Sequence, residues 1–190
     1  MDVLGGISRN QVEPLIKELA DRLSQKGVYA HLRLIGGSAL LMQGVATRFT
    51  HDIDAVPPVG DPLWAQWSIV EEIVNDIGER YGLGQHWLNK DAAIFLPANA
   101  EWEMITCSST LTLEVASVET LLAMKICSDR RKDVPDIRLL LIRLGLQASP
   151  ESAVNTTFRI YGDDPANLNH EREYYLTKIQ AICDSIVADV

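Results

Sequence analysis

The sequence is poor in long apolar runs and in cysteine, and each scarcity excludes a class of protein. No stretch approaches ~18 consecutive apolar residues, so no transmembrane helix and no membrane partner are expected. The N-terminus shows no basic segment followed by an apolar run, so we expect a cytoplasmic protein without a secretory signal. The three cysteines, Cys107, Cys127 and Cys183, form no CxxC pair, which argues against a disulfide framework and a cysteine zinc site.

Positive charge is also scarce. The 190 residues contain 17 Lys and Arg against 26 Asp and Glu, a net charge of −9. Such a surface repels a nucleic-acid backbone except where basic residues cluster locally, as at 130–132. A general DNA-coating role is therefore not expected. The hydrophobic content of 47% is typical of a globular core.

The spacing of apolar residues predicts an α+β fold. Helical periodicity or strong helix formers mark residues 8–25, 38–43, 61–79, 118–127, 133–144 and 169–188. Alternation predicts strands over 29–35, 51–56, 103–107 and 111–116. We expect a mixed sheet of four or five strands flanked by helices within an α/β core, residues 1–116. A helical C-terminal region, residues 117–190, is expected to pack on that core.

Two acidic residues and a glycine turn form the most informative pattern. Asp52 and Asp54 flank Ile53 on a predicted strand, so their side chains share one side, ~7 Å apart at Cα. Carboxylates held that close repel each other unless a cation lies between them, and oxygen ligands of this kind suit Mg²⁺. The pattern predicts a magnesium site formed by Asp52 and Asp54.

The turn Gly36-Gly37-Ser38 precedes this strand and offers a complementary phosphate site. Its two glycines allow close approach of an anion, and Ser38 is predicted to donate its hydroxyl and to cap the following helix. Arg48 and Thr50 could add charge and hydrogen bonds to phosphate. Taken alone, the glycine turn is an ordinary turn and the acid pair a solvated strand edge. Their order along the chain favours function.

These residues belong to a longer pattern: the run Leu34-Ile35-Gly36-Gly37-Ser38-Ala39-Leu40, followed by Gly44, Arg48, Thr50 and Asp52-Ile53-Asp54. This pattern resembles the nucleotidyltransferase superfamily of the DNA polymerase β-like fold. Within it, the chain is most similar to AbiEii-type bacterial toxins and uncharacterised relatives. This resemblance implies Mg²⁺-dependent transfer of a nucleoside monophosphate from an NTP to an acceptor, which could be RNA, a protein or a small molecule. It also implies a toxin–antitoxin role, with an antitoxin partner or self-association. The alternative is a catalytically inactive nucleotide-binding or partner-binding module of the same fold, which an uncertain third carboxylate favours.

Later residues could complete the site. Lys125 lies on the apolar face of its predicted helix, where an ammonium group needs a partner. In a structural interpretation, its partner is an Asp side chain. In a functional interpretation, its partner is a nucleotide phosphate or a catalytic carboxylate. Asp133 and Asp136 are either helix-capping residues or, as the resemblance implies, nucleotide-binding and catalytic residues. For a third carboxylate, Asp91 is preferred over two further candidates, Glu103 and Glu114.

The apolar stripe of the last predicted helix (Tyr175, Ile179, Ile182 and Ile186) could serve an interface, although internal packing is favoured.

Overall fold

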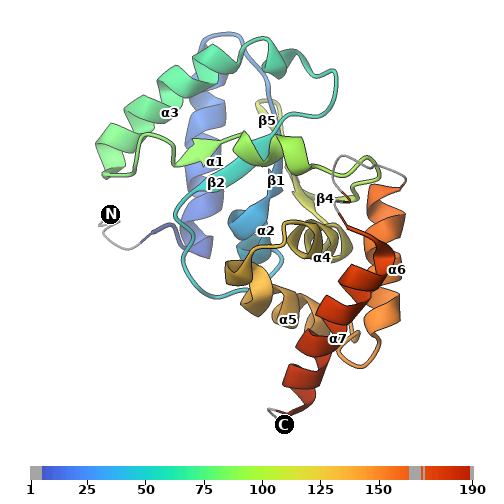
Figure 1. The fold of residues 1–190 in the computed structure, drawn as a ribbon. Helices are drawn as coiled ribbons and strands as arrows, with labels where there is room; N and C mark the ends of the chain where they lie inside the picture. The colour runs from blue at the N-terminus through green and yellow to red at the C-terminus, as the bar shows by residue number, and fades with distance from the viewer. Residues whose placement is uncertain (1–5, 163–167, 169, 189–190) are drawn as a thin grey trace. The chain divides into compact units, whose positions relative to one another are not determined.

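The computed structural model describes residues 6–162, 168 and 170–188 (Figure 1). The chain divides into two compact units. The first comprises Met1–Ala93 with Trp102–Val115, and the second comprises Ile94–Glu101 with Ala116–Val190. A five-stranded mixed sheet with flanking helices and a helical C-terminal part confirms the predicted α+β class.

The first unit begins with α1 (Arg9–Gln25), whose apolar side chains recur at helical spacing and are buried. Ser8 and Gln11 form a capping box at its start. A short α2 (Gly36–Met42) follows the first strand directly. Next along the chain come the 3₁₀ turn η1 (Pro62–Trp64) and helix α3 (Trp67–Tyr81), which ends at Gly82 in a left-handed conformation.

The sheet has the strand order β3-β2-β1-β5-β4. The central strand β1 (Ala30–Ile35) pairs antiparallel with β2 (Ile53–Val56) and parallel with β5 (Leu111–Ala116). The short strand β3 (Leu88–Asn89) runs parallel to β2 at one edge. At the other edge lies β4 (Trp102–Cys107), which a tight turn over 108–110 joins to β5.

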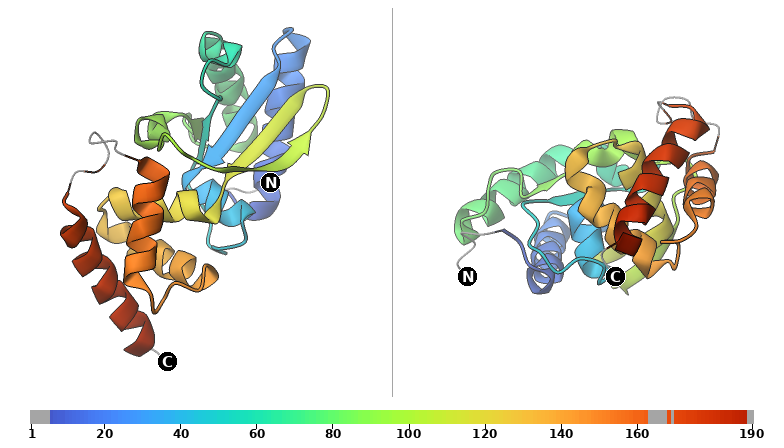
Figure 2. Two further views of the ribbon diagram at one scale, coloured as in Figure 1. Left: turned by 90° about the vertical axis from the view of Figure 1, so that its right-hand side faces the viewer. Right: turned by 60° about the horizontal axis from the view of Figure 1, so that its bottom comes forward.

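The two faces of the sheet differ in chemistry. On β1, Ala30, Leu32 and Leu34 are fully buried, and α1 packs against this strand and against α3. Figure 2 (left) shows α1 and α3 together behind the strands. The alternate residues His31 and Arg33 are only half-buried. One face of the sheet therefore forms the core of this unit, while the opposite face presents polar side chains.

The second unit is helical. The short η2 (Asp91–Phe95) begins in the first unit and ends in the second. The remaining elements are α4 (Val118–Cys127), η3 (Arg131–Asp133), α5 (Val134–Arg143), α6 (Pro150–Tyr161) and α7 (Arg172–Ala188). The apolar stripe of α7 is buried, and α7 packs against α5 and α6, so the favoured interpretation of internal packing is confirmed.

Most predicted elements are present, with shifts at their ends. Strand β5 and helix α4 begin and end at the predicted residues. The two-residue strand β3 was not predicted, because two residues carry no measurable alternation. The helix predicted over 61–79 is split into η1 and α3. Among the described helices, none has both the length and the apolarity needed to cross a bilayer.

Candidate functional site

The acid pair lies at the start of β2 in the first unit. Asp54 is the second residue of β2, opposite Ile35 of β1, and Asp52 immediately precedes the strand. Both side chains are half-buried, whereas Ile53 between them is fully buried. Anchoring Ile53 in the core holds the two carboxylates at the solvent-accessible side of this strand.

Strand β3 brings a third polar residue to the acid pair. Asn89 is the registered partner of Asp54, and its Nδ2 donates to Oδ2 of Asp52 at 3.4 Å. The buried Trp87 fixes the position of this strand through two hydrogen bonds. Its carbonyl accepts from the Ile53 N–H at 2.6 Å, and its indole N–H donates to the Val74 carbonyl at 2.8 Å. Asn89 was missed as a site residue because its position depends on the pairing of β3 with β2, which the sequence did not reveal.

The glycine turn packs directly against the acid pair. Gly36 adopts φ +64°, and a Cβ placed there would lie 2.2 Å from Oδ2 of Asp54. At Gly37 a Cβ would lie 2.6 Å from Oγ1 of Thr50. Real Cβ atoms do not approach oxygen so closely, and a left-handed φ further favours glycine at position 36. A Cβ at position 36 would therefore collide with the Asp54 side chain, and a Cβ at position 37 would collide with the Thr50 side chain.

Two predicted phosphate ligands have other contacts. Ser38 is fully buried, and its hydroxyl donates to the Ile35 carbonyl at 3.1 Å. The prediction that Ser38 caps the helix is wrong, because α2 begins at Gly36 with Ile35 as N-cap and has no side-chain cap. Thr50 is also buried, and its hydroxyl donates to the Asp52 carbonyl at 3.0 Å. Arg48 is exposed in the loop between α2 and β2.

The backbone of Thr50 is held as firmly as its side chain. Its N–H and carbonyl exchange hydrogen bonds with Ile7, at 3.0 and 2.6 Å, which forms an isolated β-bridge. Ile7 is itself buried. The loop leading into Asp52 is therefore tethered to the segment that precedes α1.

Within the described part of the chain, the acid pair has no third acidic neighbour placed to share a metal ion. Among the described residues, no group of three or more His, Cys, Asp or Glu side chains is placed to hold a metal ion. Asp91, the preferred candidate, is exposed at the start of η2, and its backbone N–H donates to Oδ1 of Asn89 at 2.9 Å. Glu103 is exposed on β4.

Glu114, the remaining candidate, is engaged on β5. Its Oε2 accepts from Nε of Arg33 at 2.7 Å and lies 3.0 Å from Nε2 of His31. Burial opposes its charge, but the hydrogen bonds and charges of Arg33 and His31 outweigh burial and lower the pKa of Glu114. The Arg33 guanidinium also lies over the Trp102 ring, 4.7 Å from its centroid. Glu114 therefore stays ionised and paired.

The donor chemistry of the acid pair fits a magnesium ion. Mg²⁺ binds oxygen ligands and commonly uses one or two protein carboxylates, with the rest of its shell from water and substrate phosphates. Asp52 and Asp54 supply two such carboxylates at one end of β2, where Oδ2 of Asp54 packs against Gly36. These residues would hold the ion, with phosphate oxygens completing its coordination.

Lys125, Asp133 and Asp136 form a buried ionic cluster within the second unit. Nζ of Lys125 lies 2.6 Å from Oδ1 of Asp133 and 2.9 Å from Oδ2 of Asp136. Lys125 is 8% exposed, and the two aspartates are 2% and 1% exposed. The ammonium group on the apolar face of α4 thus has carboxylate partners, as its position required. We refer to these three residues as the Lys125 cluster.

Asp133 has further partners beyond the lysine. Its Oδ2 accepts from Oγ of Ser128 at 2.7 Å and from Nε of Arg130 at 2.8 Å. Burial opposes ionisation of Asp133, but these donors together with Lys125 lower its pKa below the usual range. Asp133 is the N-cap residue of α5 and Asp136 lies in its first turn, as the capping interpretation predicted, but the Asp133 side chain makes no cap hydrogen bond.

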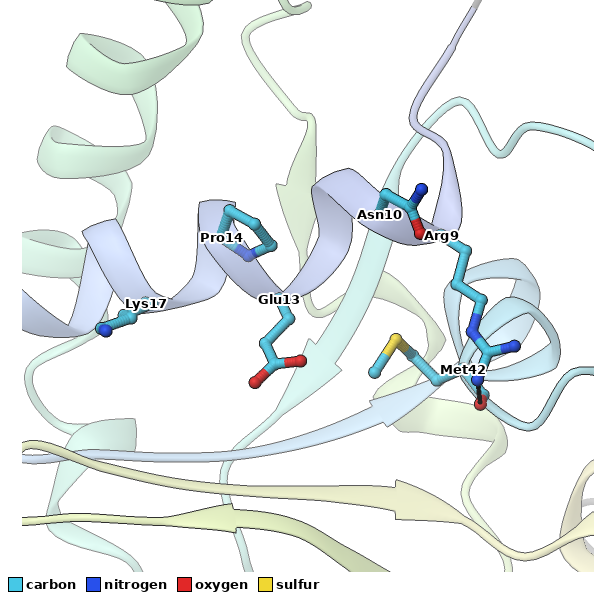
Figure 3. A pocket seen from close by; sticks show the side chains of 6 residues that line it. All are labelled: Arg9, Asn10, Glu13, Pro14, Lys17 and Met42. Carbon is cyan, nitrogen blue, oxygen red and sulfur yellow. Dashed lines mark hydrogen bonds between the residues drawn. The ribbon is translucent and has the colours of Figure 1, made fainter.

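A separate shallow pocket lies on α1 and α2 of the first unit (Figure 3). In it, Arg9 donates to the Met42 carbonyl at 3.3 Å. Its volume is about 460 Å³, and it is lined by Arg9, Asn10, Glu13, Pro14, Lys17 and Met42. It includes none of the predicted site residues.

Comparison with known proteins gives a family match. Residues 11–146 match the sequence profile of a family described as "Nucleotidyltransferase of unknown function (DUF6036)". The matched range contains the glycine turn, the acid pair, Asn89 and the Lys125 cluster. No curated protein matches the chain. No solved structure matches it.

Proposed function

Because this chain belongs to the family of nucleotidyltransferases of unknown function, we propose that it transfers a nucleoside monophosphate from an NTP to an acceptor at Asp52 and Asp54, with release of pyrophosphate. The observation that carries this proposal is the contact of the glycine turn with the acid pair. Gly36 has a left-handed backbone, and Oδ2 of Asp54 occupies the place where a side chain would begin, so the turn proposed to bind phosphate and one proposed metal ligand lie side by side.

In this proposal the chain's residues divide the work of phosphoryl transfer. Asp52 and Asp54 would hold Mg²⁺, which supplies neutralisation of the charge that develops on the phosphates. The backbone at Gly36 and Gly37, at the start of α2, would contact the outer phosphates of the NTP, and Arg48, exposed in the loop between α2 and β2, would add positive charge. Since little covalent chemistry falls to the protein, positioning and electrostatics provide most of the acceleration.

Ser38, Thr50 and the Lys125 cluster have structural roles in this proposal. The hydroxyls of Ser38 and Thr50 donate to backbone carbonyls that shape the turn and the acid pair. The contacts of Lys125 are with Asp133 and Asp136, which supports a role in stabilising the second unit. The catalytic roles predicted for Asp91, Lys125 and Asp136, and the nucleotide contact predicted for Asp133, stay predictions.

We propose further that the acceptor offers a hydroxyl group, on RNA, a protein or a small molecule, and that the chain acts as an AbiEii-like toxin held in check by a partner. A second candidate function is a nucleotide-binding module that does not transfer the nucleotide. It is favoured by one observation, the lack of a third acidic neighbour at the pair among the described residues.

A labelled-nucleotide experiment tests the proposal and separates the two candidates. The chain is incubated with Mg²⁺, an NTP labelled at the α-phosphate, and total RNA or protein as acceptor. We expect label on an acceptor with the natural chain and none with Asp52→Asn combined with Asp54→Asn. Both chains should show the same circular dichroism spectrum, because the two half-buried carboxylates lie outside the core. Nucleotide binding without transfer by the natural chain would support the module, and full transfer by the double variant would refute the proposal.

A further inference from the structure

We infer that Asn89 is a positioning residue that sets the acid pair to hold a single divalent ion. The inference rests on the proposed function. It assigns to Asn89 two effects that can be measured without catalysis. The amide orients Asp52, and it places a neutral group in the sheet position next to Asp54.

The sheet register defines this position. Strand β3 runs parallel to β2, with Ile53 paired with Leu88 and Asp54 paired with Asn89. Paired residues on neighbouring strands project their side chains from the same face of a sheet. A third carboxylate from the next strand would therefore come from position 89, where the chain has an amide. The exposed Asp91, two residues further along, starts η2 and lies outside β3.

The hydrogen bonds of Asn89 fix which end of its amide faces Asp52. Oδ1 accepts the Asp91 backbone N–H at 2.9 Å, and only the carbonyl end of an amide can accept that bond. Nδ2 consequently faces Oδ2 of Asp52, at 3.4 Å, and the His86 carbonyl, also at 3.4 Å. A hydrogen-bond donor beside a carboxylate orients it and stabilises its charged form.

The charge at position 89 determines how strongly the site needs a cation. With Asn89 in place, the site contains two carboxylates, Asp52 and Asp54, and one neutral amide. An aspartate at position 89 could keep the bond from the Asp91 N–H, because Asp forms the same local turn, but its second oxygen would face Asp52. Three carboxylates would then repel one another in the absence of metal and bind a divalent ion more tightly.

The test is a Mn²⁺ titration followed by electron paramagnetic resonance, with thermal melting in the presence and absence of Mg²⁺. The chains compared are the natural chain, Asn89→Asp and Asn89→Ala. Asn99→Ala is the matched control, because it removes an amide that donates to the Arg159 carbonyl and contacts neither acid. Asp52→Asn combined with Asp54→Asn gives the background from other surface acids.

We expect one Mn²⁺ above background in the natural chain. Asn89→Asp should bind about tenfold more tightly, because the number of ligand charges rises. In the absence of metal, Asn89→Asp should also melt at a lower temperature than the natural chain. Addition of Mg²⁺ should raise the Tm of Asn89→Asp by more than that of the natural chain. Asn89→Ala should bind about tenfold more weakly, the usual cost of losing an outer-shell partner. Asn99→Ala should match the natural chain.

Failure of this inference can be told from failure of the proposed function. If the natural chain binds Mn²⁺ above background but Asn89→Asp and Asn89→Ala bind like it, the role of Asn89 is refuted and the acid pair stands. Two ions in the natural chain would also refute it. If the natural chain and the double acid variant bind alike, no metal is held at the pair and both proposals fall. Should Asn89→Ala not fold, Asn89→Asp still decides the outcome, because it retains the acceptor for the Asp91 N–H.

Discussion

Removing the ammonium group of the Lys125 cluster should be among the most destabilising changes in the second unit. Lys125→Met keeps most of the apolar stem but leaves Asp133 and Asp136, 2% and 1% exposed, without their shared cation. Breaking a buried ion pair from one side costs about 3–5 kcal/mol, because the remaining charge is neither hydrated nor balanced. For a chain of this size, each kcal/mol lowers Tm by about 2–4 °C, so the expected fall is about 6–20 °C.

Thermal unfolding followed by far-ultraviolet circular dichroism measures this effect. Lys132→Met is the matched control, because Lys132 is exposed on η3, and such surface changes stay within about 0.5 kcal/mol. Adding Asp136→Asn to Lys125→Met should recover part of the loss, since it removes one of the two buried carboxylate charges that Lys125 contacts in the natural chain. If Lys125→Met and Lys132→Met melt at the same temperature near neutral pH, the electrostatic account of the cluster is wrong.

The pH dependence of this variant follows from the pKa of Asp133. Lys125, Ser128 and Arg130 lower that pKa against the effect of burial. A carboxyl group whose pKa is lowered by folding stabilises the folded state at pH values above its unfolded-state pKa of about 3.9. This stabilisation is lost as the pH falls through the folded-state pKa. The difference in Tm between the natural chain and Lys125→Met should therefore shrink toward acid pH. A difference that grows on acidification would contradict this sign.

Three other substitutions give sharp expectations. Gly36→Ala should abolish NTP binding in calorimetry. It should also lower stability by more than Gly60→Ala, because both glycines have a positive φ but only a Cβ at position 36 would meet a side chain, that of Asp54. The strain shared by the two is about 1–2 kcal/mol. Ser38→Ala should cost about 1 kcal/mol in urea unfolding yet leave NTP affinity unchanged, because its hydroxyl donates to the Ile35 carbonyl. Glu114→Gln should cost about 1–2 kcal/mol near neutral pH. Because the pKa of Glu114 is lowered, that loss should fade below about pH 4, and a loss independent of pH would refute the pairing with Arg33.

The parts of the site that the sequence predicted are those that depend on local spacing. Alternation around Ile53 and the glycine turn placed Asp52 and Asp54 at the start of a strand with Gly36 beside them. Helical spacing put Lys125 on the apolar face of α4, which required a buried partner for its ammonium group.

The parts that escaped prediction depend on tertiary pairing. Strand β3 has two residues, and only its register with β2 brings Asn89 to the acid pair. Ser38 has a residue type suited to a helix cap, yet α2 starts two residues earlier, at Gly36, with Ile35 as its N-cap. Asp133 is the N-cap residue of α5, but its oxygens accept from Lys125, Ser128 and Arg130.

The bridge between Ile7 and Thr50 has a practical consequence for work with this protein. Two backbone hydrogen bonds join the residues that enter α1 to the residue whose hydroxyl supports the Asp52 carbonyl. A deletion that extends through Ile7 would therefore remove this tether two residues before a predicted metal ligand. Weak activity in a chain shortened in this way would reflect a loosened loop and not the absence of catalytic residues.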